Sequence, residues 1–358
     1  ALAGMVRRGP VSAGGSFRLL PAADGRWLGV SLARPSDEEL VPALVEDSRV
    51  AGEPWDALVR WAARTSAEDA ATRAQLLGVP AAAVPVAGER DDQLTYRHDE
   101  GPVRPFILEA IGQRAVAPPA RPLVVDLSSL WAGPLCAHLL GLAGMRVVKV
   151  ESTRRPDGAR RGNTAFYDLL HGGHEAVAVD FTTGPGRAAL RELLAHADVV
   201  IEASRPRALA QLGITPRQAA ADRPGLTWVS ITGYGRSGPW ADRVGFGDDV
   251  AAAAGLVAWD AHGPVPCGDA LADPLTGAHA AAAAMAGLLG GGGLLVDVAM
   301  RDVCLAAAVL DAGGTPPRGL EPAVPVARTP SASAPGLGAD TDRVLAEYGI
   351  RYGCSPEA

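Results

Sequence analysis

The chain has 358 residues, enough for two domains or for one large domain with a small satellite. Apolar residues make up 48% and charged residues 20%, which is typical of an ordinary soluble globular protein. The net charge of −7 provides no basic surface for nucleic acid, so we expect no nucleic-acid partner.

The first hundred residues alternate between strand and helix patterns. Residues 16–32 predict a β-hairpin that turns at Asp24 and Gly25. Helical patterns follow over 37–46 and 53–77, and the second one ends at Gly78. We therefore assign residues 1–100 to a small α+β domain.

The next stretch, residues 101–120, is weakly patterned and contains several prolines, so we interpret it as a linker. From residue 122 onward, apolar segments of strand length alternate with helical patterns. Strands are predicted at "PLVVDL", "MRVVKVE", "EAVAVDF", "DVVIEA", "LTWVSITGYG" and "LLVDVAM". Strands that are apolar throughout are typical of a parallel sheet covered on both faces.

This pattern predicts an α/β fold: a Rossmann-like doubly wound parallel sheet with a second, smaller α+β domain. We place the Rossmann-like domain at 121–310, followed by a Pro- and Ala-rich connection and a C-terminal segment at 311–358. The first strand is not followed by Gly-x-Gly-x-x-Gly, which disfavours dinucleotide binding.

An acid stands at the start of the alanine-rich segment "ADPLTGAHAAAAAMAGLL". Asp273 precedes Pro274, a residue favoured in a first helical turn. One interpretation is a helix N-cap, because Asp oxygens satisfy backbone N–H groups there. The other is a carboxylate kept ionised for chemistry by the helix dipole. The local sequence leaves both open.

The four cysteines lie far apart and form no Cys-x-x-Cys pair, which favours reduced thiols and argues against a zinc site. We expect no metal.

The apolar run 277–289 is too short for a bilayer, and the N-terminal residues lack the apolar core of a signal peptide. These features predict a cytoplasmic protein with no membrane partner. Lys149 is the one lysine among 33 basic residues, which we attribute to codon bias.

Several motifs occur in register over the second half of the chain: "VVDLSSLWAGPLCAHLLGLAGMRVVKVE", "AVAVDFTTGPGRAALRELLAHADVVIEASRP", "ITGYGRSGP", "LADPLTGAHAAAAAMAGLL", "VDVAMRD" and "APGLGADTDRVLAEYGI". Together they resemble the class III CoA-transferase family, which also contains the 2-methylacyl-CoA racemases. The resemblance implies a Rossmann-type large domain, a small α+β domain and commonly an interlocked homodimer.

The order of the segments departs from that family, whose small domain lies between the "VDVAM" strand and the closing segment. Here the segments that resemble the small domain, "PAADGRWLGV" and "LLGVPAAAVPV", stand near the N-terminus. The chain therefore looks circularly permuted or cut from a tandem fusion, which is tolerable when the joined ends lie close together at a surface. We expect residues 16 to about 100 to lie near Asp273.

The resemblance also implies a chemistry and its residues. The family uses an aspartate as nucleophile, which falls on Asp273, and passes through a mixed anhydride and an aspartyl-CoA thioester. The substrates would be an acyl-CoA and a carboxylic acid acceptor, with no permanently bound cofactor. The CoA-binding residues implied are Trp131, Ala132, Gly133, Pro134, Arg154, Arg155 and Arg160. The plainer alternatives are a helix start at 131–134 and a solvated basic loop at 154–160.

Other positions depart from the family pattern. Phe246 stands where the racemases have a histidine, and His262 and His279 are the nearest other candidates for a second base. Polar or cationic CoA contacts are also replaced, for example by Thr182 and Ala203. We therefore rank an acyl-CoA:carboxylate CoA-transferase first. The alternatives are a catalytically inactive homologue that serves as a subunit or binding module, and a racemase-like isomerase.

Overall fold

The structure is a computed structural model that describes residues 6, 8–48, 52–86, 91–99, 101–117, 119–309, 326 and 328–353. The chain divides into two compact units. Unit 1 contains Ala1–Pro105, Thr232–Thr276 and Ala299–Pro325, and unit 2 contains Phe106–Ile231, Gly277–Val298 and Val326–Ala358. These units differ from the domains expected from sequence, because Thr232–Thr276 lies within the expected range 121–310 but packs in unit 1.

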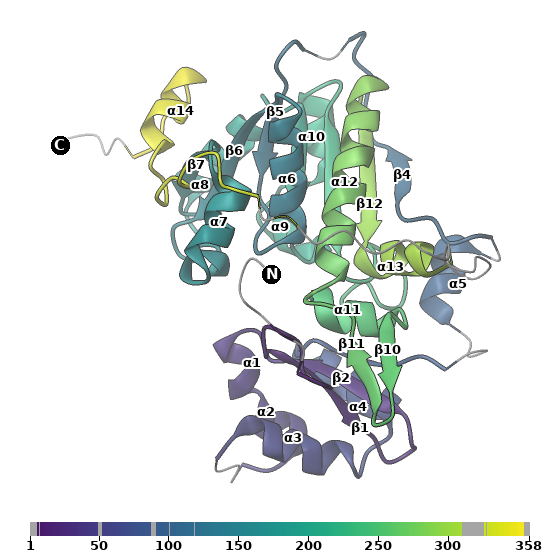
Figure 1. Ribbon diagram of the computed structural model, residues 1–358. Helices are drawn as coiled ribbons and strands as arrows, with labels where there is room; N and C mark the ends of the chain where they lie inside the picture. The colour runs from purple at the N-terminus through teal and green to yellow at the C-terminus, as the bar shows by residue number, and fades with distance from the viewer. Residues whose placement is uncertain are drawn as a thin grey trace. The chain divides into compact units, whose positions relative to one another are not determined.

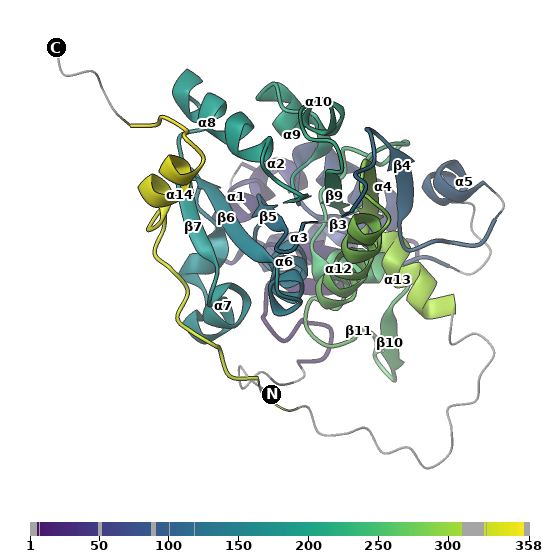
Figure 2. The ribbon, with the colours of Figure 1, turned by 90° about the horizontal axis from the view of Figure 1, so that it is seen from above.

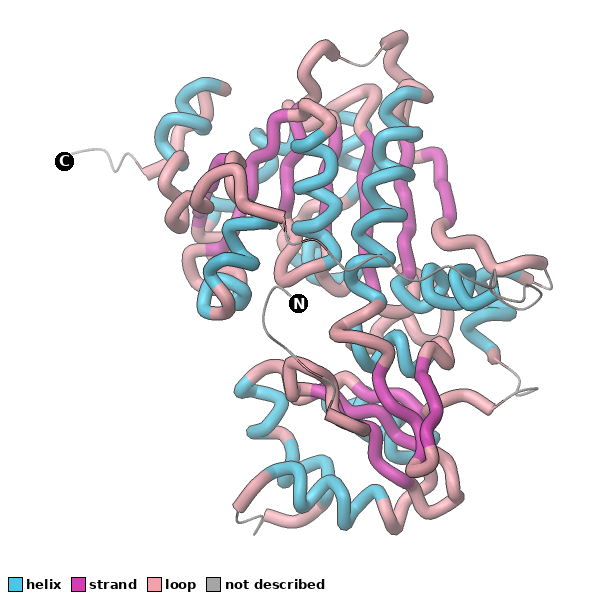
Figure 3. The backbone as a smooth tube through the Cα atoms, in the orientation of Figure 1, coloured by secondary structure: helices cyan, strands magenta, loops and turns pink. Residues whose placement is uncertain are grey.

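Unit 1 contains a three-stranded antiparallel sheet in the order β1-β2-β3, visible in magenta in Figure 3. The strands are β1 (Phe17–Pro21), β2 (Trp27–Ser31) and β3 (Ala81–Ala83). The predicted hairpin is confirmed, with Phe17 opposite Ser31 and Pro21 opposite Trp27. Gly25 adopts a φ of 77° in the turn, a conformation that glycine adopts without strain.

The helices of this segment are shorter than predicted. They are α1 (Pro35–Glu39), α2 (Val41–Val45), α3 (Pro54–Ala62) and α4 (Ala67–Leu77). The prediction of one helix over 53–77 is wrong, because Ser66 begins a new helix by accepting the N–H of Asp69 at 3.2 Å. The predicted end at Gly78 is confirmed, since this residue has the left-handed conformation (φ 80°) of a helix terminus.

Further elements, most of them from the middle and end of the sequence, complete unit 1. They are α5 (Asp92–His98), α11 (Gly247–Ala253), the antiparallel pair β10 (Val257–Asp260) and β11 (Gly263–Pro266), the first turn of α12 (Ala272–Leu289) and α13 (Met300–Val309). Helix α11 packs on β2 and β3, and Ser31 Oγ donates to Asp249 Oδ1 at 2.8 Å. These contacts explain why residues 232–276 belong with the N-terminal segment.

Unit 2 is built around a seven-stranded sheet in the order β4-β12-β9-β8-β5-β6-β7 (Figure 1). Its strands are β4 (Ile107–Ala110), β5 (Leu123–Asp126), β6 (Arg146–Ser152), β7 (Glu175–Val179), β8 (Val199–Glu202), β9 (Thr227–Thr232) and β12 (Leu294–Ala299). The pairs β5–β6, β6–β7, β5–β8 and β8–β9 are parallel, which confirms the predicted Rossmann-like α/β fold.

Part of the predicted linker belongs to this sheet. Within 101–120, strand β4 pairs antiparallel with β12, with Ala110 opposite Leu294. Strand β4 is only four residues long and most of it is exposed, although Ile107, Leu108 and Ala110 are apolar. Ile107–Ala110, within the stretch interpreted as a linker, is therefore a strand of the sheet.

Helices cover both faces of the sheet, as Figure 2 shows. Helices α8 (Gly184–Leu194), α9 (Pro206–Gln211) and α10 (Pro216–Asp222) lie on one face, and α6 (Ala132–Leu142), α7 (Thr164–His171) and the later part of α12 lie on the other. This arrangement explains why every residue of β5 is buried. None of the helices among the described residues is both long and apolar enough to cross a membrane.

The C-terminal segment packs at the β7 edge of unit 2. Helix α14 (Thr341–Glu347) contacts β7, and the backbone N–H of Asp340 donates to the carbonyl of Ala176 at 2.9 Å. Residues 310–325 of the predicted connection lie outside the described residues. Cys136, Cys267 and Cys304 are free thiols, and Cys354 also lies outside the described residues.

Candidate active site

Asp273 is the second residue of α12, not the residue that precedes the helix. Its backbone N–H donates to the carbonyl of Ala270 at 2.9 Å, and its side chain is half-buried. Because the helix begins before Asp273, the simple N-cap interpretation fits poorly. A carboxylate in a first helical turn is stabilised in its ionised form by the helix dipole.

The turn before α12 is held by a second acid. Ala270 adopts a φ of 46°, an uncommon conformation for a residue with a side chain. Its N–H donates to Asp248 Oδ1 on α11 at 2.7 Å. Strained backbone persists where surrounding contacts enforce it. The bond from Asp248 therefore fixes the turn that leads into Asp273.

The carboxylate of Asp273 lies against Gly247, the first residue of α11. A β-carbon at position 247 would come within 2.1 Å of Asp273 Oδ2 and within 2.6 Å of Ala270 Cβ. No side chain other than hydrogen fits there without displacement. Gly247 therefore allows the two helix starts to approach closely around the carboxylate.

Burial raises the pKa values of neighbouring ionisable groups in unit 1 to different degrees. Burial raises the pKa of Asp248 to about 6 and that of Asp249 to about 8. Burial, and secondarily the negative charge of Asp273, raises the pKa of the Cys304 thiol to about 12. Cys304 therefore holds its proton at neutral pH and is a poor nucleophile.

The structure puts the residues implied for CoA binding in unit 2, on the loops that follow β5 and β6. Ala132, Gly133 and Pro134 are buried in the first turn of α6, while Trp131 is half-exposed with its ring 5.0 Å from that of Phe166. A β-carbon on Gly133 would come within 2.2 Å of the Ser128 side chain. Gly133 thus permits the helix to pack against the loop.

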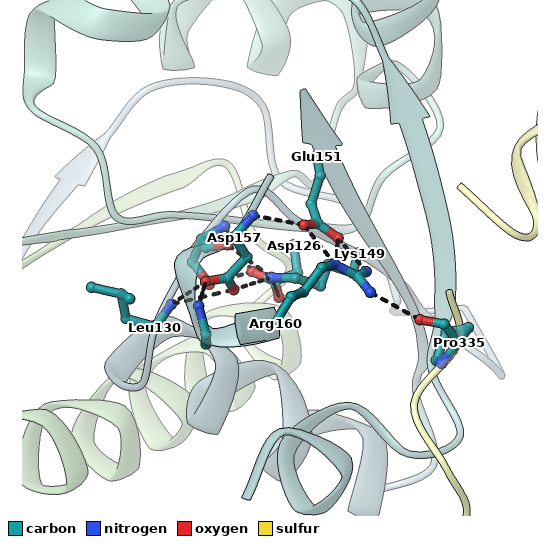
Figure 4. Close-up of polar contacts among 9 residues, drawn as sticks. Asp126, Leu130, Lys149, Glu151, Asp157, Arg160 and Pro335 are labelled. Atoms are coloured by element: carbon teal, nitrogen blue, oxygen red, sulfur yellow. Dashed lines mark hydrogen bonds and ion pairs between the residues drawn. The ribbon is translucent and has the colours of Figure 1, made fainter. Parts of the chain in front are cut away.

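The three arginines differ in their surroundings. Arg154 and Arg155 are exposed, and Arg154 Nε donates to Asp180 Oδ2 at 2.9 Å. Arg160 pairs with Glu151 at 2.5 Å and donates to the carbonyl of Pro335 at 3.1 Å (Figure 4). The guanidinium of Arg160 is therefore partly buried among contacts within the protein, whereas Arg154 and Arg155 are exposed and Arg154 keeps its pair with Asp180.

Sequence reasoning missed the buried charges beneath these loops. Asp126, Lys149 and Glu151 are all buried, and Figure 4 shows them grouped with Asp157 and Arg160. The signal was available in the composition, since Lys149 is the one lysine among 33 basic residues. The attribution to codon bias gave no reason to expect that this lysine is buried.

The position of the missing racemase histidine and the two other histidine candidates occupy different elements. Phe246 precedes α11, and the Arg34 guanidinium carbon lies 5.2 Å from the centre of its ring. His262 is exposed in the turn between β10 and β11. His279 lies on α12, six positions after Asp273, which directs it to a different side of the helix.

A family model supplies the decisive observation: residues 122–334, more than half of the chain, match the model of CoA-transferase family III. The chain belongs to CoA-transferase family III. The matched range includes Asp273 and every residue singled out above for CoA binding.

Individual members of this family are similar to the chain over part of its length. The succinyl-CoA–D-citramalate CoA-transferase of Chloroflexus aurantiacus is 31% identical over 206 residues, covering 52% of this chain and 51% of that protein. The human succinyl-CoA:glutarate CoA-transferase is 32% identical over 188 residues, covering 49% and 43%. The chain spans about half the length of these curated relatives.

The fold also matches a solved structure. The crystal structure of a hypothetical protein from Mycobacterium tuberculosis superposes with a TM-score of 0.51 at 32% sequence identity. The match covers 54% of this chain and 58% of that protein. This match agrees with the α/β fold of the chain.

Proposed function

We propose that the protein transfers CoA from an acyl-CoA donor to a carboxylic acid acceptor, with Asp273 as the nucleophile. Membership of CoA-transferase family III supports this reaction class. The observation that carries the proposal is the carboxylate of Asp273, set in the first turn of α12 and packed against Gly247. Relatives with succinyl-CoA in their names make this thioester the first donor to test.

The proposed reaction needs no external oxidant or metal for its atoms and electrons to balance. The Asp273 carboxylate attacks the acyl carbonyl, the carbon–sulfur bond breaks, and CoA leaves as the thiolate. The thiolate then attacks the aspartyl carbonyl of the mixed anhydride, which releases the donor acid and leaves an aspartyl-CoA thioester. The acceptor carboxylate repeats the two steps in reverse and regenerates Asp273.

A carboxylate is a weak nucleophile, so its position matters more than its basicity. The Asp248–Ala270 hydrogen bond and the contact with Gly247 restrict where the Asp273 oxygens lie. Trp131 to Pro134 are the proposed contacts for the pantetheine arm. Arg154, Arg155 and Arg160 are the proposed contacts for the phosphates, and the two exposed ones suit this role best.

An isomerase needs a second base, and Phe246 cannot serve as one. The remaining alternative is a family member that binds CoA or a partner chain without turnover. A covalent adduct at Asp273 distinguishes the two possibilities, because an inactive homologue would form none.

The test is chemical trapping. The protein is incubated with succinyl-CoA and with a panel of short-chain acyl-CoA donors in the presence of hydroxylamine, and then analysed by peptide mass spectrometry. Hydroxylamine attacks the activated aspartyl carbonyl, so we expect an aspartyl hydroxamate at residue 273 and none in Asp273→Ala. CoA binding without a hydroxamate from any donor would identify an inactive homologue.

A further inference from the structure

Lys149 is the one lysine among 33 basic residues, and it is buried. It lies on β6 in register with Asp126 of β5, and its side chain is only 2% exposed. Lysine is among the residues least often fully buried, because removing its charge from water costs several kilocalories per mole. The position therefore calls for a specific explanation.

The ammonium group of Lys149 reaches the loop that follows β5. Nζ donates to the carbonyl of Ser128 at 2.9 Å, and it lies 3.1 Å from Asp157 Oδ2 and 3.8 Å from Asp126 Oδ2. Both of these carboxylate side chains are fully buried. One cation thus holds a loop carbonyl and two carboxylates together (Figure 4).

Asp157 extends this group to both loops. It accepts the N–H of Leu130 at 3.1 Å, from the loop after β5, and the N–H of Ala159 at 3.0 Å, from the turn after β6. Its own N–H donates to Glu151 Oε1 at 2.8 Å, and Glu151 in turn pairs with Arg160. The chain of contacts therefore runs from Ser128 through Lys149 to Arg160.

The backbone of Leu130 shows that the loop after β5 adopts an unfavourable conformation, which contacts with the rest of the protein must maintain. Its φ is 68°, an uncommon conformation for a residue with a side chain, and 40% of it is exposed. The hydrogen bond to Asp157 is the contact that retains its backbone there. Leu130 immediately precedes Trp131 and the first turn of α6.

Stability alone does not explain a buried lysine, because an apolar side chain of similar volume is often as stabilising as a buried ion pair. Charge alone does not explain it either, since arginine supplies the positive charge at every other basic position of the chain. A compact ammonium fits between three oxygens in an enclosed space, where the larger planar guanidinium does not.

We propose that Lys149 is a positioning residue, whose compact ammonium group fixes loops 127–131 and 153–161 in the one arrangement that receives CoA. The proposal rests on the proposed function, because it concerns the same CoA-binding loops. Without the ammonium group, the buried carboxylates of Asp157 and Asp126 lose the cation that both of them approach, and the loops separate. CoA affinity then falls although Lys149 itself does not touch the ligand.

The test compares three variants of the full chain by calorimetric titration with CoA. We expect Lys149→Met and Lys149→Arg each to raise the Kd for CoA by about tenfold or more, as small misplacements of binding groups do. Val150→Ala is the matched control: it also removes a buried contact from β6, but on the opposite face of the strand. Its Kd should remain that of the wild type.

Hydrogen exchange of peptides covering 127–131 and 153–161 supplies the second readout. Protection should fall in both Lys149 variants and remain in Val150→Ala. Asp157→Asn is the milder variant if Lys149→Met does not fold: it keeps one acceptor oxygen and loses the ion pair, so both readouts should move in the same direction.

The outcomes separate the two proposals. Wild-type Kd and loop protection in Lys149→Met, or an equal loss in Val150→Ala, would overturn the positioning role. Wild-type affinity in Lys149→Arg would overturn the requirement for lysine. If the wild type binds no CoA at all, the proposed function fails first, and the positioning role fails with it.

Discussion

Asp273 Oδ2 and Gly247 are packed so closely that a β-carbon at position 247 would lie 2.1 Å from the oxygen. The two residues come from different helix starts, α12 and α11. Even the added methyl group of an alanine at position 247 is therefore predicted to displace the Asp273 carboxylate.

Gly247→Ala should lower the rate of CoA transfer by about 100-fold or more, because the added methyl group displaces the Asp273 carboxylate from its reacting position. Gly184→Ala is the matched control: Gly184 is also the first residue of a helix, and its added β-carbon meets nothing within 4 Å. Steady-state kinetics with matched protein concentrations check both. Normal turnover in Gly247→Ala would contradict the assigned geometry.

Asp273→Asn should abolish CoA transfer while the protein stays folded, because the amide has almost the same shape but is not nucleophilic. The measurement is product formation by chromatography, together with circular dichroism and a thermal melt. Asp273→Ala serves as the companion variant and should be equally inactive. Full activity in Asp273→Asn would eliminate this residue as the nucleophile.

Asp249 should make the protein less stable as the pH rises. Its pKa in the folded protein is raised by burial from 3.8 to about 8, so the folded state holds a proton that the unfolded state releases. The stabilising effect is complete below about pH 4 and is lost as the pH rises through 8. Asp249→Asn should therefore be more stable than the wild type at pH 8 but not at pH 4.

Urea denaturation at these two pH values measures the difference. The asparagine keeps the oxygen that accepts the Ser31 hydroxyl and the Phe246 N–H, so little else changes. Asp260→Asn, at the exposed last position of β10, controls for the loss of one carboxylate. An equal stability difference at both pH values would refute a buried, protonated Asp249.

We expect a homodimer in solution, because the two domains of class III CoA-transferases commonly complete one another through a partner chain. Light scattering after size-exclusion chromatography at micromolar concentration should give twice the chain mass of 36.7 kDa. A single monomer peak across the concentration range would count against the expectation and would favour a rearranged chain that no longer interlocks.

The sequence predicted those parts of the fold in which burial on both faces makes the strand itself apolar. Strands β5 and β8 were found in this way, since all of their residues are buried. Strand β4 was missed because its short apolar run, Ile107–Ala110, lies within a proline-containing stretch that was interpreted as a linker. The break at Ser66 was missed because the alanine-rich residues on either side favour a helix equally well.

In the candidate site, too, the sequence predicted single residues but not the contacts between them. The resemblance located Asp273. Its contact with Gly247 and the hydrogen bond from the Ala270 N–H to Asp248 are tertiary contacts, which leave no local pattern in the sequence. The proposed role of Lys149 depends on contacts with Ser128 and Asp157, which belong to the loops that follow the paired strands β5 and β6. Such groupings follow from topology, which periodicity does not specify.

The antiparallel strand β4 has a consequence for any attempt to isolate the family-matched region. A fragment cut to residues 122–334 would lack β4, and β12 would become the edge of the sheet. Five of the six residues of β12 are buried, and its backbone N–H and C=O groups on that side would then be unpaired. Exposed apolar edges of this kind recruit further strands. Strand β4 therefore protects this edge of β12 from pairing with another chain.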